Sequence, residues 1–233
     1  MKKICFLLVL LGCPFLVSAL ELASNAKSGI IMEPTTNKVI FEKNSHERLE
    51  PASMTKMMTL LLTFEALDNG KISLDDMVHI SKVAAAMGGS QMFLEENSNI
   101  RLEEIIKGVS IASANDGAVA LAEYIGGSVE NFVDMMNKKA EDLGLSNTHF
   151  VNPHGLHDDN HYSSAYDMAI MAANLIDHEK ILNYTSIYED YFNKPDGSRT
   201  WLVNTNKLTR YYEGVDGLKT GYTKEAGYCL TAT

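Results

Sequence analysis

A hydroxyl and an amine lie three residues apart at Ser53 and Lys56. In a helix this spacing places both side chains on one face, one turn apart and within reach of each other. A serine hydroxyl is a weak nucleophile until a base removes its proton, and a lysine becomes such a base when its pKa falls toward neutrality. Burial and a second nearby cation both lower a lysine pKa. The pair predicts nucleophilic serine chemistry, but it is also common on solvated helices and needs support from other residues.

That support comes from two later motifs. Ser113-Ala114-Asn115 lies between two predicted helical segments, and Lys219-Thr220-Gly221 lies on a predicted strand. The order S-x-x-K, S-x-N, K-T-G is typical of penicillin-binding proteins and β-lactamases. Each motif alone occurs easily by chance, whereas all three in this order and in the expected settings do not.

The segments that must position these motifs can be predicted from sequence patterns. Two short β-type runs, 28–33 and 38–43, flank a turn and predict a hairpin. Apolar spacing and capping residues predict helices over 54–69, 102–110, 116–124, 129–143 and 164–176. Strand character returns at 200–203 and from 214 onward. Strands at both chain ends, with a helical subdomain over about 60–195 between them, predict an α+β fold whose sheet is built from both ends.

The first residues have the layout of a secretory signal peptide. Two lysines precede an apolar run over 4–11, and a small-residue cleavage site follows at 17–19. This predicts that residues 1–19 are a signal peptide, that 20–233 form the catalytic domain, and that the protein is exported. A lipoprotein signal ending at Cys13 is an alternative, although the residues before this cysteine fit that motif poorly.

Charge and cysteine content narrow the function classes. Residues 1–19 include two of the 20 basic residues and none of the 30 acidic ones, so the remaining chain has a formal net charge of −12. Such a surface repels phosphate backbones, which argues against a nucleic-acid partner. Cys5 and Cys13 leave with the signal, so Cys229 has no partner within the chain and is expected to be a buried small hydrophobe.

The sequence resembles the low-molecular-mass penicillin-binding proteins, the serine D-alanyl-D-alanine carboxypeptidases. The resemblance extends beyond the three motifs, through residues 51–59, 110–118, 152–156, 161–168 and 216–229. It implies a β-lactamase/transpeptidase-like fold that acts without a cofactor or a metal. It also implies that the substrates are peptidoglycan stem peptides ending in D-Ala-D-Ala and that β-lactam antibiotics are inhibitors. The protein is then expected to be located in the periplasm or at the outer face of the cytoplasmic membrane or the cell wall.

The resemblance also implies a role for each candidate residue. Ser53 attacks the carbonyl between the two D-alanines, Lys56 is its base, and Ser113 relays protons between the two lysines. The substrate-binding set comprises Asn115 for the substrate amide, Lys219 and Thr220 for the terminal carboxylate, Gly221 for close approach of the substrate, and the backbone N–H of Tyr222, which with that of Ser53 forms an oxyanion hole.

The sequence departs from the family pattern in two places. Many relatives carry a histidine where this chain has Tyr222, which leaves the backbone N–H unchanged. The chain also ends at Thr233, inside a predicted strand. The family's sheet continues beyond that point, and a β-rich domain and a membrane-binding amphipathic tail commonly follow. We therefore expect the domain to be incomplete at its C-terminus, with weak activity in this form.

Three other functions were weighed. A zinc peptidase would use the histidines of one loop, His154, His157 and His161, but the loop lacks an H-E-x-x-H helix. A class A β-lactamase would need a glutamate that activates the deacylating water. Candidate glutamates in the general region, none in a matching motif, are Glu141, Glu179 and Glu189. A non-catalytic wall-binding protein is the third alternative, and the intact Ser53, Lys56 and Lys219 argue against it.

Overall fold

The computed structural model describes residues 22–194 and 196–233. The predicted signal peptide, residues 1–19, lies outside these described residues, as does Cys13. Among the helices of the described part, none is both long enough and apolar enough to cross a membrane.

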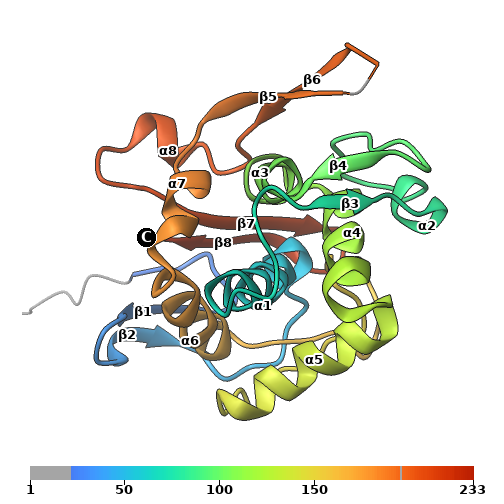
Figure 1. Ribbon diagram of the computed structural model, residues 1–233. Coiled ribbons are helices and arrows are strands. Elements are labelled where there is room, and N and C mark those ends of the chain that lie inside the picture. The colour runs from blue at the N-terminus through green and yellow to red at the C-terminus, as the bar shows by residue number, and fades with distance from the viewer. Residues whose placement is uncertain (1–21, 195) are drawn as a thin grey trace, which may run out of the picture.

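Helices and strands alternate along the chain in a mixed arrangement (Figure 1). In chain order the elements are β1 (Gly29–Glu33), β2 (Lys38–Lys43), the 3-10 helix η1 (Ala52–Thr55), α1 (Lys56–Asp68), β3 (Met77–His79), α2 (Lys82–Ala85), β4 (Asn99–Arg101), α3 (Leu102–Ala112), α4 (Asn115–Gly126), α5 (Val129–Asp142), α6 (Ala165–Ile176), the 3-10 helix η2 (Glu179–Ile181), α7 (Leu182–Thr185), β5 (Glu189–Asn193), β6 (Arg199–Val203), α8 (Leu208–Tyr211), β7 (Leu218–Thr223) and β8 (Gly227–Ala232).

Every strand of the described residues pairs antiparallel with its neighbour in the chain. The result is four two-stranded sheets, β1–β2, β3–β4, β5–β6 and β7–β8. The predicted α+β class is confirmed, but the predicted single sheet built from both chain ends is not formed. Each strand is hydrogen-bonded on one side only, to its neighbour in the chain. Among the described residues no further strand joins β1–β2 to β7–β8. Helix α6 contacts both β1 and β8 and so packs against both hairpins.

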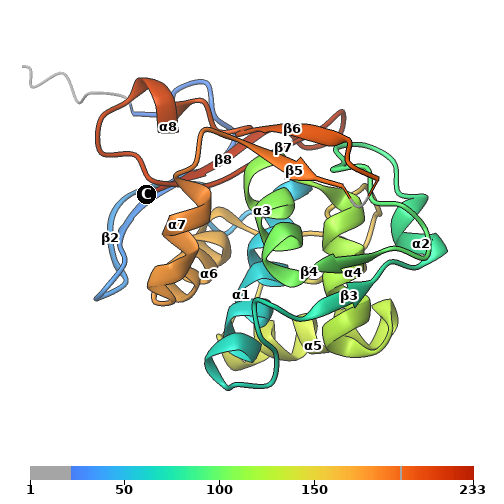
Figure 2. The same cartoon turned by 45° about the horizontal axis from the view of Figure 1, so that its top comes forward.

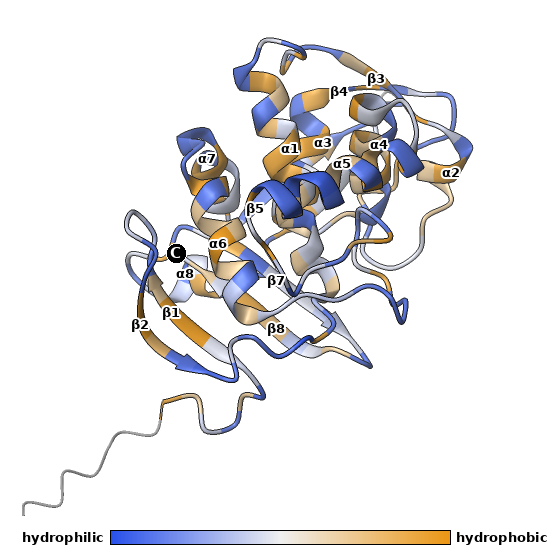
Figure 3. Ribbon diagram, turned by 90° about the horizontal axis from the view of Figure 1, so that it is seen from below, coloured by the Kyte–Doolittle hydropathy of each residue, from blue (hydrophilic) through white to orange (hydrophobic). Residues whose placement is uncertain are grey.

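Helix α1 is the centre of the structure. Ten of its 13 residues are buried, because α4, α5 and α6 pack around it (Figure 2). A helix that is apolar on all sides belongs in a core, whereas α5 is amphipathic and buries one stripe at four-residue spacing, Phe132, Met136 and Ala140. Figure 3 shows this contrast as a mostly hydrophobic α1 and a hydrophilic outer side of α5. The first turn of α1 carries Lys56, so this lysine is anchored in the buried core.

The long predicted helices form within two residues of their expected ends. Ser164 caps α6 by accepting a hydrogen bond from the Asp167 backbone N–H at 3.1 Å, as its position before the helix predicts. The paired strands β3 and β4 inside the helical region were not predicted, because strands of three residues show no clear alternation. The segment predicted as a helical subdomain, about 60–195, also contains strand β5, Glu189–Asn193.

Candidate active site

Ser53 and Lys56 lie on adjacent turns, as their spacing predicts. Ser53 is in η1 and Lys56 is the first residue of α1, and the Lys56 Nζ atom lies 2.8 Å from Ser53 Oγ. The Lys56 side chain is fully buried, while Ser53 is partly exposed. A buried amine thus faces a hydroxyl that a substrate can reach.

The backbone just before Ser53 is held in an uncommon conformation. Ala52 has a φ of +47°, in the left-handed region that residues with a Cβ rarely adopt. Its carbonyl accepts a hydrogen bond from Thr55 Oγ1 at 2.8 Å, and that hydroxyl also contacts His161 Nε2 at 2.7 Å. Gly155 packs directly on Ala52, since a Cβ added to Gly155 would lie 1.9 Å from the Ala52 carbonyl oxygen. The surroundings therefore hold the strained turn that presents Ser53.

Lys56 has two further hydrogen-bond partners besides Ser53. Its Nζ donates to Asn115 Oδ1 and to the backbone carbonyl of His154, both at 2.7 Å. Burial, and next the positive charge of Lys219, lower the pKa of Lys56 well below its usual value, and the carboxylate of Asp116 partly opposes this shift. These are the two causes that the sequence argument named for a lysine base.

Ser113 and Lys219 form a second buried pair. Ser113 ends α3 with a φ of +60°, which turns its hydroxyl toward β7, and Lys219 Nζ donates to Ser113 Oγ at 2.9 Å. Burial lowers the pKa of Lys219 to about 7. Among the described residues no hydrogen bond joins Ser113 to Lys56, whose partners are Ser53, Asn115 and the His154 carbonyl.

Strand β7 forms the remaining side of the site. Lys219 is buried at its start, and the Thr220 hydroxyl donates to Thr205 Oγ1 at 2.7 Å. A Cβ on Gly221 would lie 2.9 Å from the Ser53 backbone nitrogen and 3.1 Å from the Pro51 carbonyl oxygen. The structure thus gives a reason for Gly221 other than the one predicted. The glycine lets β7 approach the segment that carries Ser53, and its missing side chain faces that segment.

Tyr222 follows on the outer face of the β7–β8 hairpin. Its side chain is 58% exposed and its ring packs against that of Tyr228, with centroids 4.8 Å apart. Tyr222 and Tyr228 are directly opposite each other in the hairpin register, so the contact is a cross-strand pair. The ring points away from the core, which leaves the backbone of Tyr222 as the part expected to serve the site.

Some groups that shape the site were missed in the sequence. The Asp116 carboxylate is buried and accepts hydrogen bonds from the backbone N–H groups of Met92, Leu94 and Gly117. It therefore ties the loop before β4 to the start of α4, next to Asn115. The position of Asp116 directly after the S-x-N motif was an available signal. No sequence signal pointed to the His154 carbonyl or to Thr205, because a contact made by a loop backbone or by a single threonine produces no recognisable motif in the sequence.

The histidines of the 152–161 loop point to different places. His154 and His161 are buried, and burial lowers their pKa values to about 3 and about 4, so both are neutral. His161 receives the backbone N–H of Val151 at Nδ1 and contacts Thr55 at Nε2. His157 is exposed and faces Glu50. The three rings do not converge on one point, in line with the argument against a zinc peptidase.

Comparison with known proteins identifies the family. The family model described as D-alanyl-D-alanine carboxypeptidase matches residues 16–233. The chain is 58% identical over 213 residues to D-alanyl-D-alanine carboxypeptidase DacF of Bacillus subtilis, covering 91% of this chain and 55% of that protein. It is 39% identical to D-alanyl-D-alanine carboxypeptidase DacC of Escherichia coli, covering 90% and 53%.

Solved structures agree with this result. Penicillin-binding protein 5 of Haemophilus influenzae is 41% identical with a TM-score of 0.83, covering 89% of this chain and 60% of that one. Penicillin-binding protein D2 of Listeria monocytogenes in its ampicillin-bound form is 29% identical with a TM-score of 0.77, covering 89% and 83%. The predicted transpeptidase-like fold is thereby confirmed. The chain spans about half the length of the curated relatives it matches. On these matches, the chain belongs to the D-alanyl-D-alanine carboxypeptidase family.

Proposed function

We propose that the protein is a serine-type D-Ala-D-Ala carboxypeptidase, which removes the terminal D-alanine from peptidoglycan pentapeptides through an acyl-enzyme on Ser53. The observation that carries this proposal is the fully buried Lys56 amine, 2.8 Å from Ser53 Oγ and held by two other acceptors. Membership of the family and the named activity of its relatives support the choice of substrate.

The hydrogen bonds around Lys56 define which way the proton moves. A neutral amine has two N–H bonds and one lone pair. The Asn115 Oδ1 and the His154 carbonyl can only accept, so they take both N–H bonds. The lone pair is then left to accept the proton of the Ser53 hydroxyl, which is the direction that a general base requires. The lowered pKa of Lys56 favours this neutral form.

The reaction follows from this arrangement. Ser53 Oγ forms a bond to the carbonyl carbon of the penultimate D-alanine while its proton moves to Lys56. The oxyanion forms beside the backbone N–H groups of Ser53 and Tyr222. Return of the proton to the peptide nitrogen breaks the C–N bond and releases D-alanine. A water molecule then hydrolyses the ester and returns Ser53 to its starting state.

The second lysine completes substrate binding in this proposal. Lys219 is a buried amine at the start of β7 that donates to the Ser113 hydroxyl and to the backbone carbonyl of Thr220, and in its charged form it would pair with the carboxylate of the last D-alanine. Binding of that carboxylate favours the charged form of Lys219, because an opposite charge raises the pKa of an amine. Asn115 would position Lys56 and present its remaining N–H to the substrate amide.

The class A β-lactamase alternative finds no support in the site. Its deacylating glutamate would have to lie next to Ser53. Glu141, Glu179 and Glu189 are all exposed, and within the described residues no carboxylate hydrogen-bonds to Ser53 or Lys56. We therefore propose that β-lactams acylate Ser53 and are released slowly. We also propose that the protein works outside the cytoplasmic membrane, as its signal-like first residues suggest.

The test is release of free D-alanine from a synthetic stem pentapeptide ending in D-Ala-D-Ala. The purified protein should release one D-alanine per peptide, and Ser53→Ala should abolish release while keeping the unfolding temperature within a few degrees. The same peptide ending in L-Ala-L-Ala is the control and should not react. Release that persists in Ser53→Ala would contradict the proposal.

A further inference from the structure

We propose that Glu50, His157 and Glu225 form a binding site for a divalent metal ion, with zinc as the best match. The three side chains come from three separate segments and each offers one ligand atom, all within 4.8 Å of one another. This cluster lies apart from the buried partners of Lys56 and takes no part in the chemistry proposed for Ser53. Sequence patterns do not point to this cluster, because Glu50, His157 and Glu225 are far apart in the chain.

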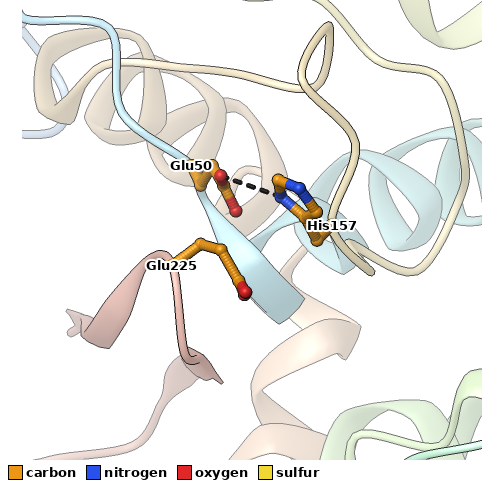
Figure 4. Close-up of side chains that lie close together, drawn as sticks. All are labelled: Glu50, His157 and Glu225. Carbon is orange, nitrogen blue, oxygen red and sulfur yellow. Dashed lines mark hydrogen bonds and ion pairs between the residues drawn. The ribbon is translucent and has the colours of Figure 1, made fainter.

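The three side chains lie close together although they come from separate segments (Figure 4). Glu50 directly precedes the Pro51–Ser53 turn, His157 follows the loop that supplies the His154 carbonyl, and Glu225 lies in the turn between β7 and β8. Figure 4 shows the Glu50 carboxylate turned toward the His157 ring, with the Glu225 side chain beside this pair. The His157 Nδ1 atom is 2.9 Å from Glu50 Oε1.

The donor set fits zinc better than calcium or magnesium. One imidazole nitrogen and two carboxylate oxygens suit zinc, whereas calcium and magnesium prefer oxygen ligands alone. With bonds of about 2.0–2.1 Å, tetrahedral zinc needs its donor atoms about 3.3 Å apart. The His157–Glu50 pair must therefore open by a few tenths of an ångström, and the separations from Glu225, which are within 4.8 Å, must close by at most about 1.5 Å. Glu225 is exposed and can make the larger movement, and a water can fill the fourth position.

The other ring nitrogen of His157 supports the same assignment. When Nδ1 binds the ion, Nε2 carries the proton and points toward Asp159, whose carboxylate oxygen is 3.8 Å away. A carboxylate behind a metal-binding histidine fixes the ring orientation and is common in zinc sites. The cluster therefore has three ligands, and the exposed Asp159 carboxylate lies near the remaining ring nitrogen without hydrogen-bonding to it.

An ion at this place would link the β7–β8 turn to the two loops that build the catalytic site. Strand β7 carries Lys219 and packs on η1, so its position relative to Ser53 decides the geometry of the site. The ion acts as a clamp between these segments and touches neither Ser53 nor Lys56. It should raise the thermal stability of the protein without being required for hydrolysis.

The test is isothermal titration of the metal-free protein with zinc chloride, which is independent of enzymatic activity. We expect one ion per chain with a dissociation constant in the micromolar range. His157→Asn and Glu225→Gln should each weaken binding by at least about 10-fold, since loss of a direct ligand should cost no less than loss of a residue behind it. The exposed His79 on β3 is remote in the chain from the cluster, and His79→Asn is the matched control that should bind as the unchanged protein does.

A second measurement separates a built site from zinc held loosely on the surface. Cobalt(II) bound by the three residues and a water should give the intense visible absorption of a tetrahedral ion, and Glu225→Gln should lose it. Circular dichroism of each variant checks that the fold is kept. Absence of binding, binding that both variants retain, or equal weakening by His79→Asn would overturn the proposal.

Discussion

Gly155 supports the active site through a backbone contact, and replacing it with alanine should damage both stability and acylation. Its φ is +86°, and an added Cβ would lie 1.9 Å from the Ala52 carbonyl oxygen and 2.8 Å from Thr55 Oγ1. The left-handed backbone alone costs about 1–2 kcal/mol for a residue with a Cβ. Forcing the two backbones apart adds about 1–3 kcal/mol.

The matched control is Gly197→Ala. Gly197 has a φ of +85°, but nothing lies within 4 Å of its added Cβ. Both variants carry the same backbone strain, so the difference between them measures the contact with Ala52. At about 2–4 °C per kcal/mol, Gly155→Ala should melt about 2–12 °C below Gly197→Ala.

Acylation should separate the two variants further. The Gly155 loop carries the His154 carbonyl, which holds Lys56 at 2.7 Å. Displacing a catalytic group by about 1 Å can cost about 100-fold in rate. We therefore expect acylation by a fluorescent penicillin to be about 100-fold slower in Gly155→Ala and unchanged in Gly197→Ala. Equal melting temperatures and equal acylation rates would refute this reasoning.

Three further predictions concern the K-T-G strand. Lys219→Ala should slow hydrolysis of a D-Ala-D-Ala peptide far more than hydrolysis of the same peptide with a C-terminal amide. The reason is that a buried cation facing a carboxylate contributes about 2–5 kcal/mol to binding. Equal losses in kcat/KM for the two peptides would assign Lys219 to the catalytic groups instead. Because burial lowers the pKa of Lys219 from 10.5 to about 7, the unfolded chain binds more protons than the folded chain between these values. The free energy of unfolding should therefore rise with pH from about 7 to about 10.5, by up to a few kcal/mol, and urea unfolding at pH 7.5 and 9.5 should show a smaller rise in Lys219→Met. Thr205→Val removes the hydroxyl that holds Thr220 at 2.7 Å, and loss of about 1 kcal/mol should raise KM about 5-fold with little change in kcat; an unchanged KM would show that Thr220 needs no such partner.

Local patterns made part of this site predictable. Ser53 and Lys56 are three residues apart, so helical geometry alone brings them together. Ser113, Asn115 and Lys219 could be placed only through the motif set, since the loops between them hide their distance in space. The structure then showed that Asn115, and not Ser113, is the direct partner of Lys56. Motif order does not specify which of two adjacent polar side chains makes a given hydrogen bond.

Contacts between loops could not be predicted. The left-handed φ of Ala52 and the close approach of Gly155 occur where two backbone segments meet whose residues are 103 positions apart in the chain. The same is true of Glu50, His157 and Glu225. Strands β3 and β4 are too short to show a clear period of two, and they are brought together across a long connection, with β3 packed on α4 and β4 on α3.

The central claim is that Ser53 is the nucleophile, and mass spectrometry after incubation with penicillin tests it most directly. The intact protein should gain the mass of one penicillin molecule, peptide mapping should place it on Ser53, and Lys56→Ala should slow its formation while the fold remains intact. The adduct should persist for minutes, as expected where no glutamate hydrogen-bonds to Ser53 in the described residues. An adduct on another residue, or no adduct on correctly folded protein, would contradict the account.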